Sequence, residues 1–172
     1  MRVLPALMLV WSASACDKFC DFEDCGSCGN ACCKLSYYVN GLSTEEVVKM
    51  LNKTLGAGGP DGHYAQVMTY EGTLGFADLR PFDKPVHFIG QAVHTTTGKA
   101  RFNDTLDFTI APTSTGSLVT AFSISQIAGA YCDSGQNFSN LQMLFASLGL
   151  DMFVRNADAS CAMDSWYLHL TS

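Results

Sequence analysis

The chain has 172 residues, a formal net charge of −6 and a hydrophobic content of 48%. This length suits one domain, and this composition supplies enough apolar side chains for a folded core. Lysine and arginine form no runs. That pattern argues against binding to nucleic acid or to anionic membrane surfaces, because both need clustered positive charge.

The N-terminus has the features of a cleaved secretory signal peptide over residues 1–15. Arg2 supplies a positive charge, and the apolar run 3–11 is shorter than the roughly 20 residues that span a bilayer. Small residues then stand at the positions that signal peptidase requires, in Ala13-Ser14-Ala15. Cleavage there would leave Cys16 first. The alternative is a bacterial lipoprotein with Cys16 lipidated, although alanine at position 13 is not the usual residue for that processing.

A cysteine-rich lead over residues 16–33 follows, and it holds six of the eight cysteines. Secretion would place them in an oxidising compartment, where neighbouring thiols form disulfides. We therefore expect up to four disulfides, with a pairing that the sequence leaves open. The cysteines concerned are Cys16, Cys20, Cys25, Cys28, Cys32, Cys33, Cys132 and Cys161.

A metal site is the alternative for the motif Cys25-Gly26-Ser27-Cys28. Structural zinc needs four thiolate or imidazole ligands, but neither a second such motif nor a histidine lies nearby in the sequence. A thioredoxin-like redox role would need the motif at the start of a helix, whereas its Gly- and Asp-rich surroundings predict a loop. We expect neither a bound metal nor a cofactor.

Residues 34–172 are expected to form a single α+β domain. A strand is predicted over 34–40, where Tyr37, Tyr38 and Val39 favour a pleated sheet. A helix is predicted to follow, because Ser43 and Glu46 form a capping box and an apolar stripe recurs at helical spacing. That stripe is Val47, Leu51 and Leu55, and the Gly-rich stretch 56–62 is predicted to be a turn.

Four further strands are predicted in segments 63–72, 86–97, 100–112 and 117–129. The segment 76–85 contains two prolines and is expected to be an irregular connection. Alternation is clearest in 100–112, with Phe102, Leu106, Phe108 and Ile110 on an apolar face and Asn103, Thr105, Asp107 and Thr109 on a polar face.

A second helix is predicted within 133–149, capped by Asp133 or Ser134 and ended by Gly149. Its apolar stripe is Phe138, Leu141, Phe145 and Leu148. The resulting order predicts an antiparallel sheet of about five strands with two helices packed on one face, preceded by the disulfide-rich segment. Three N-glycosylation sequons begin at Asn52, Asn103 and Asn137, and the one at Asn103 falls on a polar strand face.

Residues 86–148 carry three motifs that together resemble domain-of-unknown-function family 1499. They are Phe102-Asn103-Asp104-Thr105-Leu106-Asp107-Phe108, Ser123-Ile124-Ser125-Gln126 and Asp133-Ser134-Gly135-Gln136-Asn137. This chain has Asn103 where the family has aspartate, and Gln126 where the family has arginine. The resemblance implies no reaction, and the cysteine-rich lead lies outside it.

Asp104 is the first candidate for a polar site. It alternates in step with Phe102 and Leu106, so its carboxylate is expected on the apolar face of the predicted strand. Burial there would raise its pKa unless donors compensate. The residue is expected to act as a ligand anchor, as an acid/base group or as a structural carboxylate. The other polar candidates are Ser123, Ser125, Gln126, Asp133 and Asn137.

Nucleophilic catalysis has weaker support. The chain has no Gly-x-Ser-x-Gly motif, and small polar packing is the simpler explanation for Ser123 and Ser125. His87 and His94 stand seven apart on one predicted strand, so alternation predicts opposite faces.

We therefore expect a secreted or lumenal non-enzymatic protein that binds a small apolar ligand between sheet and helices, or a protein partner. A peripheral structural subunit of a lumenal or surface assembly is the alternative, and a hydrolase is the third hypothesis. No transmembrane segment is expected after the signal peptide.

Overall fold

A computed structural model of the chain describes residues 31–69, 72–127, 130, 133 and 135–155. The predicted signal peptide and nearly all of the cysteine-rich lead lie outside these residues, as do Ser134 and His169. The same holds for the candidate disulfide cysteines Cys16, Cys20, Cys25, Cys28, Cys132 and Cys161.

The described residues form an antiparallel sheet of seven strands with two helices, which confirms the α+β class and exceeds the five strands expected. The strand order is β2-β4-β5-β6-β1-β7, and β3 also pairs with β4. The strands are β1 (Cys32–Asn40), β2 (Tyr64–Gln66), β3 (Phe76–Asp78), β4 (Phe88–Thr95), β5 (Asn103–Pro112), β6 (Gly116–Ser125) and β7 (Met152–Arg155).

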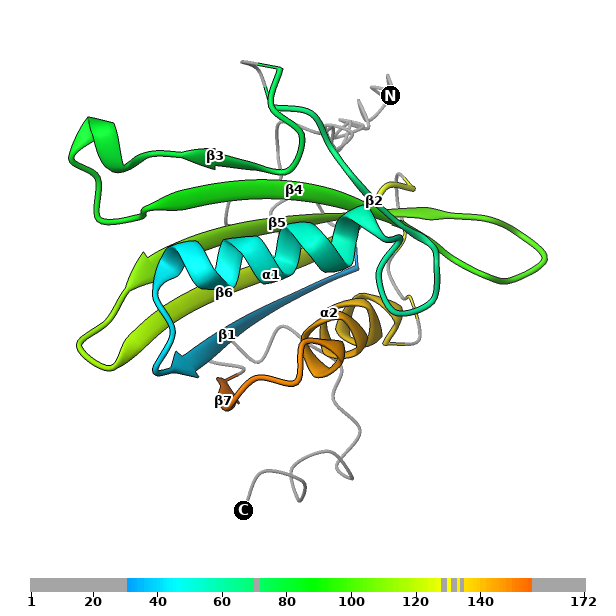
Figure 1. The fold of residues 1–172 in the computed structure, drawn as a ribbon. Helices are drawn as coiled ribbons and strands as arrows, with labels where there is room; N and C mark the ends of the chain where they lie inside the picture. The colour runs from blue at the N-terminus through cyan, green and yellow to red at the C-terminus, as the bar shows by residue number, and fades with distance from the viewer. Residues whose placement is uncertain (1–30, 70–71, 128–129, 131–132, 134, 156–172) are drawn as a thin grey trace, which may run out of the picture.

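Both helices, α1 (Thr44–Gly56) and α2 (Gln136–Ser147), lie on the same face of the sheet (Figure 1). One core cluster joins their apolar stripes to the strands beneath them. Tyr37 of β1 stacks on Phe145 of α2 with ring centroids 3.7 Å apart, which helps to hold α2 over β1 and the neighbouring β6. Neither α1 nor α2 is long and apolar enough to span a bilayer.

Helix α1 begins as the sequence predicts. The Ser43 hydroxyl accepts the backbone N–H of Glu46, and the Glu46 carboxylate accepts the backbone N–H of Ser43 at 2.9 Å. This reciprocal capping box satisfies two donors that the first turn would otherwise leave unpaired. The buried stripe contains Val47, Leu51 and Leu55, and residues 57–62 form the predicted turn.

Helix α2 begins later than predicted. Its N-cap is Gly135, which adopts the left-handed conformation, so the prediction of Asp133 as the cap is wrong. Asp133 still serves the helix start, because its carboxylate accepts the backbone N–H groups of Gly135 at 3.0 Å and Asn137 at 2.6 Å. An acidic side chain is favourable there because the first turn has unpaired N–H groups.

Two strands were not predicted. β3 lies in the segment expected to be irregular, because both prolines of that segment come after Asp78 and leave three residues free to pair with β4. The Phe76 ring packs over Gly90 of β4, where an added Cβ would lie 2.5 Å from the ring. β7, in the tail, pairs with β1 through four residues.

The faces of β5 follow the predicted alternation, with two exceptions. Leu106, Phe108 and Ile110 are fully buried, as expected. Phe102 lies before the strand and is 46% exposed, so its assignment to the apolar face is wrong. Thr105 is buried although it was placed on the polar face.

Candidate functional site

Most of the predicted polar residues meet in one place, between the ends of β5 and β6 and the first turns of α2. We call this group the polar cluster and define it as Asp104, Ser123, Ser125, Asp133, Asn137 and Asn140. Asp104 and Ser125 are direct partners across β5 and β6, which explains why their side chains share a face.

Helix α2 contributes two buried asparagines to the polar cluster. Asn140 donates to Asp104 Oδ2 at 2.8 Å. Asn137 donates to Ser125 Oγ at 3.0 Å and accepts from Ser123 Oγ at 2.7 Å. The asparagines are 1% exposed or less, so these hydrogen bonds replace water that burial removes.

Asp104 is 2% exposed. Burial is the main cause that raises the pKa of its carboxyl group, while hydrogen bonds from Asn140 and Ser125 act in the opposite direction. His94 of β4 lies directly opposite Asp104 in the sheet and also favours the ionised form. Burial therefore removes water from this carboxylate, and the neighbouring groups offset only part of the cost of that desolvation.

Gln126 is separate from the polar cluster. Its side chain donates to Thr105 Oγ1, on the opposite face of β5 from Asp104. Asn140 was not predicted as a member. The signal was present, since Asn137 and Asn140 are spaced i, i+3 beside the apolar residues of α2.

The polar cluster borders a cavity of about 680 Å³, here called the end cavity. It lies between the turn that joins β4 to β5 and the segment that joins β6 to α2. Three cluster residues reach it: Asp104, Ser125 and Asp133. The other described lining residues are Thr96, Thr97, Gly98, Ala100, Phe102, Ile127, Ala130 and Gln136.

The histidines do not complete a hydrolase site in the described part of the chain. His94 is 1% exposed, and its Nε2 lies 3.0 Å from Asp61 Oδ2, but its Nδ1 has no hydrogen-bond partner. A Ser–His–Asp triad needs a nucleophile at that second nitrogen. His87 lies outside β4, so alternation does not apply to it; its Nδ1 lies 2.9 Å from Thr44 Oγ1.

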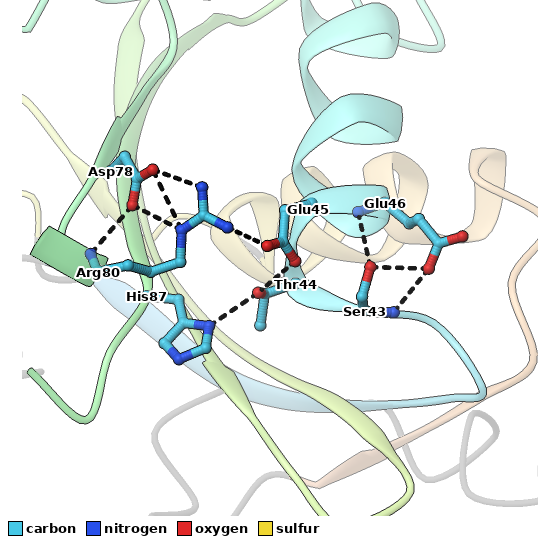
Figure 2. A network of polar contacts seen from close by, with 7 residues as sticks. All are labelled: Ser43, Thr44, Glu45, Glu46, Asp78, Arg80 and His87. Carbon is cyan, nitrogen blue, oxygen red and sulfur yellow. Dashed lines mark hydrogen bonds and ion pairs between the residues drawn. The ribbon is translucent and has the colours of Figure 1, made fainter.

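The contacts of His87 belong to a network around the start of α1 (Figure 2). Arg80 binds Asp78 and reaches across to Glu45 of α1, so it links the segment after β3 to the helix. The Thr44 hydroxyl, between His87 and Glu45, is the one group here that resembles an activated nucleophile. Thr44 is only 3% exposed, so we interpret this network as structural.

A second cavity, of about 350 Å³, lies on the sheet face that points away from the helices. We call it the sheet cavity. Ile89, Gln91, Asp107 and Thr109 reach it because they alternate with core residues of β4 and β5. The remaining described lining residues are Val67, Met68, Thr69, Gly75, Ala77, Leu79, Gly90 and Phe108.

The sheet cavity has mainly apolar walls, and its polar lining residues are Thr69, Thr109 and the hydrogen-bonded pair of Gln91 and Asp107. Gln91 Nε2 donates to Asp107 Oδ1 at 2.7 Å across β4 and β5. Six described lining residues come from the region around β2 and β3, and the backbone N–H of Val67 donates to the carbonyl oxygen of Gln91 in β4 at 3.0 Å. No sequence pattern predicts this cavity, since it depends on how that region folds over the sheet.

The asparagines of the three predicted glycosylation sequons differ in their exposure to solvent. Asn137 is buried, whereas Asn103 is exposed and Asn52 is half-buried, with its Oδ1 accepting from Gln66 at 2.6 Å. Among the residues that the structure describes, no group of three histidine, cysteine or acidic side chains is placed to hold a metal ion.

Comparison of the chain with protein families, curated proteins and solved structures finds no match. The resemblance to domain-of-unknown-function family 1499 therefore stays a prediction.

Proposed function

We propose that this protein is a secreted or lumenal, non-enzymatic binding protein that holds a small apolar ligand in the sheet cavity. The observation that supports this most is the mainly apolar lining, in which Val67, Leu79 and Ile89 accompany the hydrogen-bonded pair of Gln91 and Asp107. A concave apolar site with a few convergent polar groups is the usual form of a small-molecule site.

The volume of the sheet cavity limits the size of the ligand. About 350 Å³ is at the small end of the range for ligand pockets, roughly 300 to 1,000 Å³. The polar pair would bind one hydrogen-bonding group, while the apolar walls would cover the rest. The sequence predicts a ligand between the sheet and the helices, but the side chains of the core cluster fill that layer. We therefore place the ligand on the other face of the sheet.

Secretion and disulfides are the second part of the proposal. The N-terminal sequence supports export, and an oxidising compartment would then join the cysteines. Cys32 and Cys33 point to opposite faces of β1, so each is positioned to pair with a cysteine other than its neighbour. Intact mass before and after reduction, on protein from its native source, tests both signal removal and disulfide number.

A fluorescence titration tests the ligand site. We expect N-phenyl-1-naphthylamine, an uncharged polarity-sensitive fluorophore, to bind the full-length mature protein saturably at one site. Ala77→Phe places a ring inside the sheet cavity and should weaken binding at least about tenfold, which corresponds to about 1.4 kcal/mol.

Ala111→Phe is the matched control, since Ala111 also lies half-buried in a strand and is absent from the lining of the sheet cavity. It should leave the affinity unchanged. Equal affinity for the two variants, or no saturable binding by the wild-type protein, would contradict the proposal.

A further inference from the structure

Part of the sheet is buried on the face that points away from both helices. Phe122 is 4% exposed and Ile124 is 1% exposed. Both alternate along β6 with Ala121, a member of the core cluster, so their side chains point to the opposite face. Thr105 of β5, the direct partner of Ile124, is 5% exposed on that same face. We call Thr105, Phe122 and Ile124 the outer patch.

The described elements do not account for the burial of the outer patch. Both helices lie on the other face of the sheet (Figure 1). The region around β2 and β3 reaches the outer face at the sheet cavity, but the described residues that line this cavity include none from β6. One face of an antiparallel sheet is usually packed on the core, while the other is solvated and polar. β6 departs from that pattern at the outer patch, which therefore needs a cover of its own.

The start of β1 brings the cysteine-rich lead to this place. Cys32 pairs directly with Ile124, so its side chain stands beside the outer patch. The carbonyl oxygen of Ala31 accepts a backbone hydrogen bond from the last residue of β6 at 3.1 Å. Residues 16–30 therefore join the described domain at the edge of the outer patch. Residues 156–172 instead follow β7, which lies on the other side of β1 from β6.

The composition of the lead suits this surface. It contains two phenylalanines, Phe19 and Phe22, and four acidic residues, which are Asp17, Asp21, Glu23 and Asp24. Lys34 pairs directly with Phe122, so a positive charge stands beside the outer patch and complements the acidic lead. Phe22 precedes Ala31 by nine residues, a length that spans up to roughly 30 Å when extended. The rings can therefore reach the outer patch.

We propose that residues 16–30 fold back over the outer patch as a strap. Its two phenylalanine rings pack on Phe122 and Ile124, and its acidic groups lie near Lys34. The strap adjoins the sheet cavity, because Asp107 lines that cavity and is the direct partner of Phe122. It covers the outer patch whether or not the sheet cavity binds a ligand.

Methyl NMR of the full-length mature protein, labelled at its isoleucine methyl groups, tests the strap. A soluble gadolinium chelate speeds the relaxation of the methyl groups that it reaches. Ile110 is fully buried in the core and Ile127 is 41% exposed, so these two set the limits. We expect Ile124 to relax like Ile110 and at least about threefold more slowly than Ile127. Nuclear Overhauser contacts should join the Ile124 methyl group to the ring of Phe19 or Phe22.

A double variant, Phe19→Ser with Phe22→Ser, removes both rings and changes no residue of the described domain. The chelate should then relax Ile124 at least about threefold faster than in the wild-type protein. Phe153→Ser is the matched control, since it removes an exposed ring that stacks on Tyr38 at the far side of β1. It should leave the relaxation of Ile124 unchanged.

Three results would overturn the proposal. The first is an Ile124 methyl group that relaxes as fast as Ile127 in the wild-type protein. The second is an Ile124 that responds to Trp166→Ser in the C-terminal segment and not to the double variant, which would assign that segment to the outer patch. The third is protection of Ile124 that disappears on dilution, which would assign a second copy of the chain.

Discussion

Asn140 of α2 donates a hydrogen bond to the buried carboxylate of Asp104 on β5, with 2.8 Å between Nδ2 and Oδ2. The side-chain oxygen of the same asparagine accepts a hydrogen bond from Gln136, and its backbone carbonyl oxygen accepts one from the Tyr64 hydroxyl at 2.7 Å. Asn140 therefore joins the second helix to two strands through groups that water cannot reach, and its hydrogen bonds should contribute strongly to stability.

Asn140→Ala should lower the free energy of unfolding by about 2–3 kcal/mol, because it removes the donor to a buried charged group. Urea unfolding followed by circular dichroism measures this. In an Asp104→Asn background, Asn140→Ala should lower the free energy of unfolding by less, since the buried side chain at position 104 that loses its donor is then neutral.

Asn40→Ala is the matched control, as Asn40 also donates to an aspartate, Asp151, but at the surface and at 3.2 Å. Its effect should stay within about 0.5 kcal/mol. An equal loss from Asn140→Ala in both backgrounds would show that Asp104 and Asn140 are not coupled.

Asp104 also makes stability depend on pH. Its pKa is raised by burial in the folded state, so the folded protein holds this proton more tightly than the unfolded chain. Below pH 4, roughly the ordinary pKa of an aspartate, the carboxyl group is protonated in both the folded and the unfolded state, so it does not lower stability. As pH rises through that value and then through the raised one, the unfolded chain ionises first and stability falls. Relative to Asp104→Asn, the wild-type protein should lose free energy of unfolding over this interval in urea titrations at successive pH values. A difference between the two proteins that stays constant with pH would argue against a raised pKa.

The network at the start of α1 makes a separate prediction. A hydrogen bond from Arg80 is the main cause that lowers the pKa of Asp78 to about 2. Arg80→Gln should therefore raise the pKa of Asp78 toward the ordinary value of about 4, as measured by NMR titration of the carboxyl carbon. Arg101→Gln, an exposed arginine elsewhere, should leave that pKa unchanged. A pKa of Asp78 that does not respond to Arg80→Gln would show that the ion pair is not formed in solution.

Glycosylation should distinguish the sequons. In protein made through a eukaryotic secretory pathway, we expect a glycan on Asn103, which is exposed on β5. Asn137 is 1% exposed and its amide nitrogen is hydrogen-bonded within the polar cluster, so it should remain unmodified. Peptide mass spectrometry with and without glycosidase treatment checks both sites. A glycan on Asn137 in folded protein would contradict the packing of α2.

Local chemistry made part of this fold predictable. The capping box of Ser43 and Glu46 depends only on residues three apart, so the start of α1 was predicted correctly. The alternation of side chains along β5 likewise identified Asp104 as a polar residue on a buried face.

The errors have a different origin. β3 and β7 have three and four residues, too few for a period of two to be recognised. Phe102 extends the apolar pattern of β5 beyond the point where the strand begins. Both cavities depend on tertiary contacts between distant segments, such as Ala77 with β4, and no local pattern encodes them.

The central claim is that the sheet cavity holds a small apolar ligand, and NMR mapping tests it most directly. Amide chemical shifts of the mature protein would be recorded during titration with N-phenyl-1-naphthylamine. We predict that the largest shifts cluster at Val67, Ala77, Leu79, Ile89 and Gln91. Shifts confined to the end cavity or scattered over the surface, or no shifts at all, would contradict the claim.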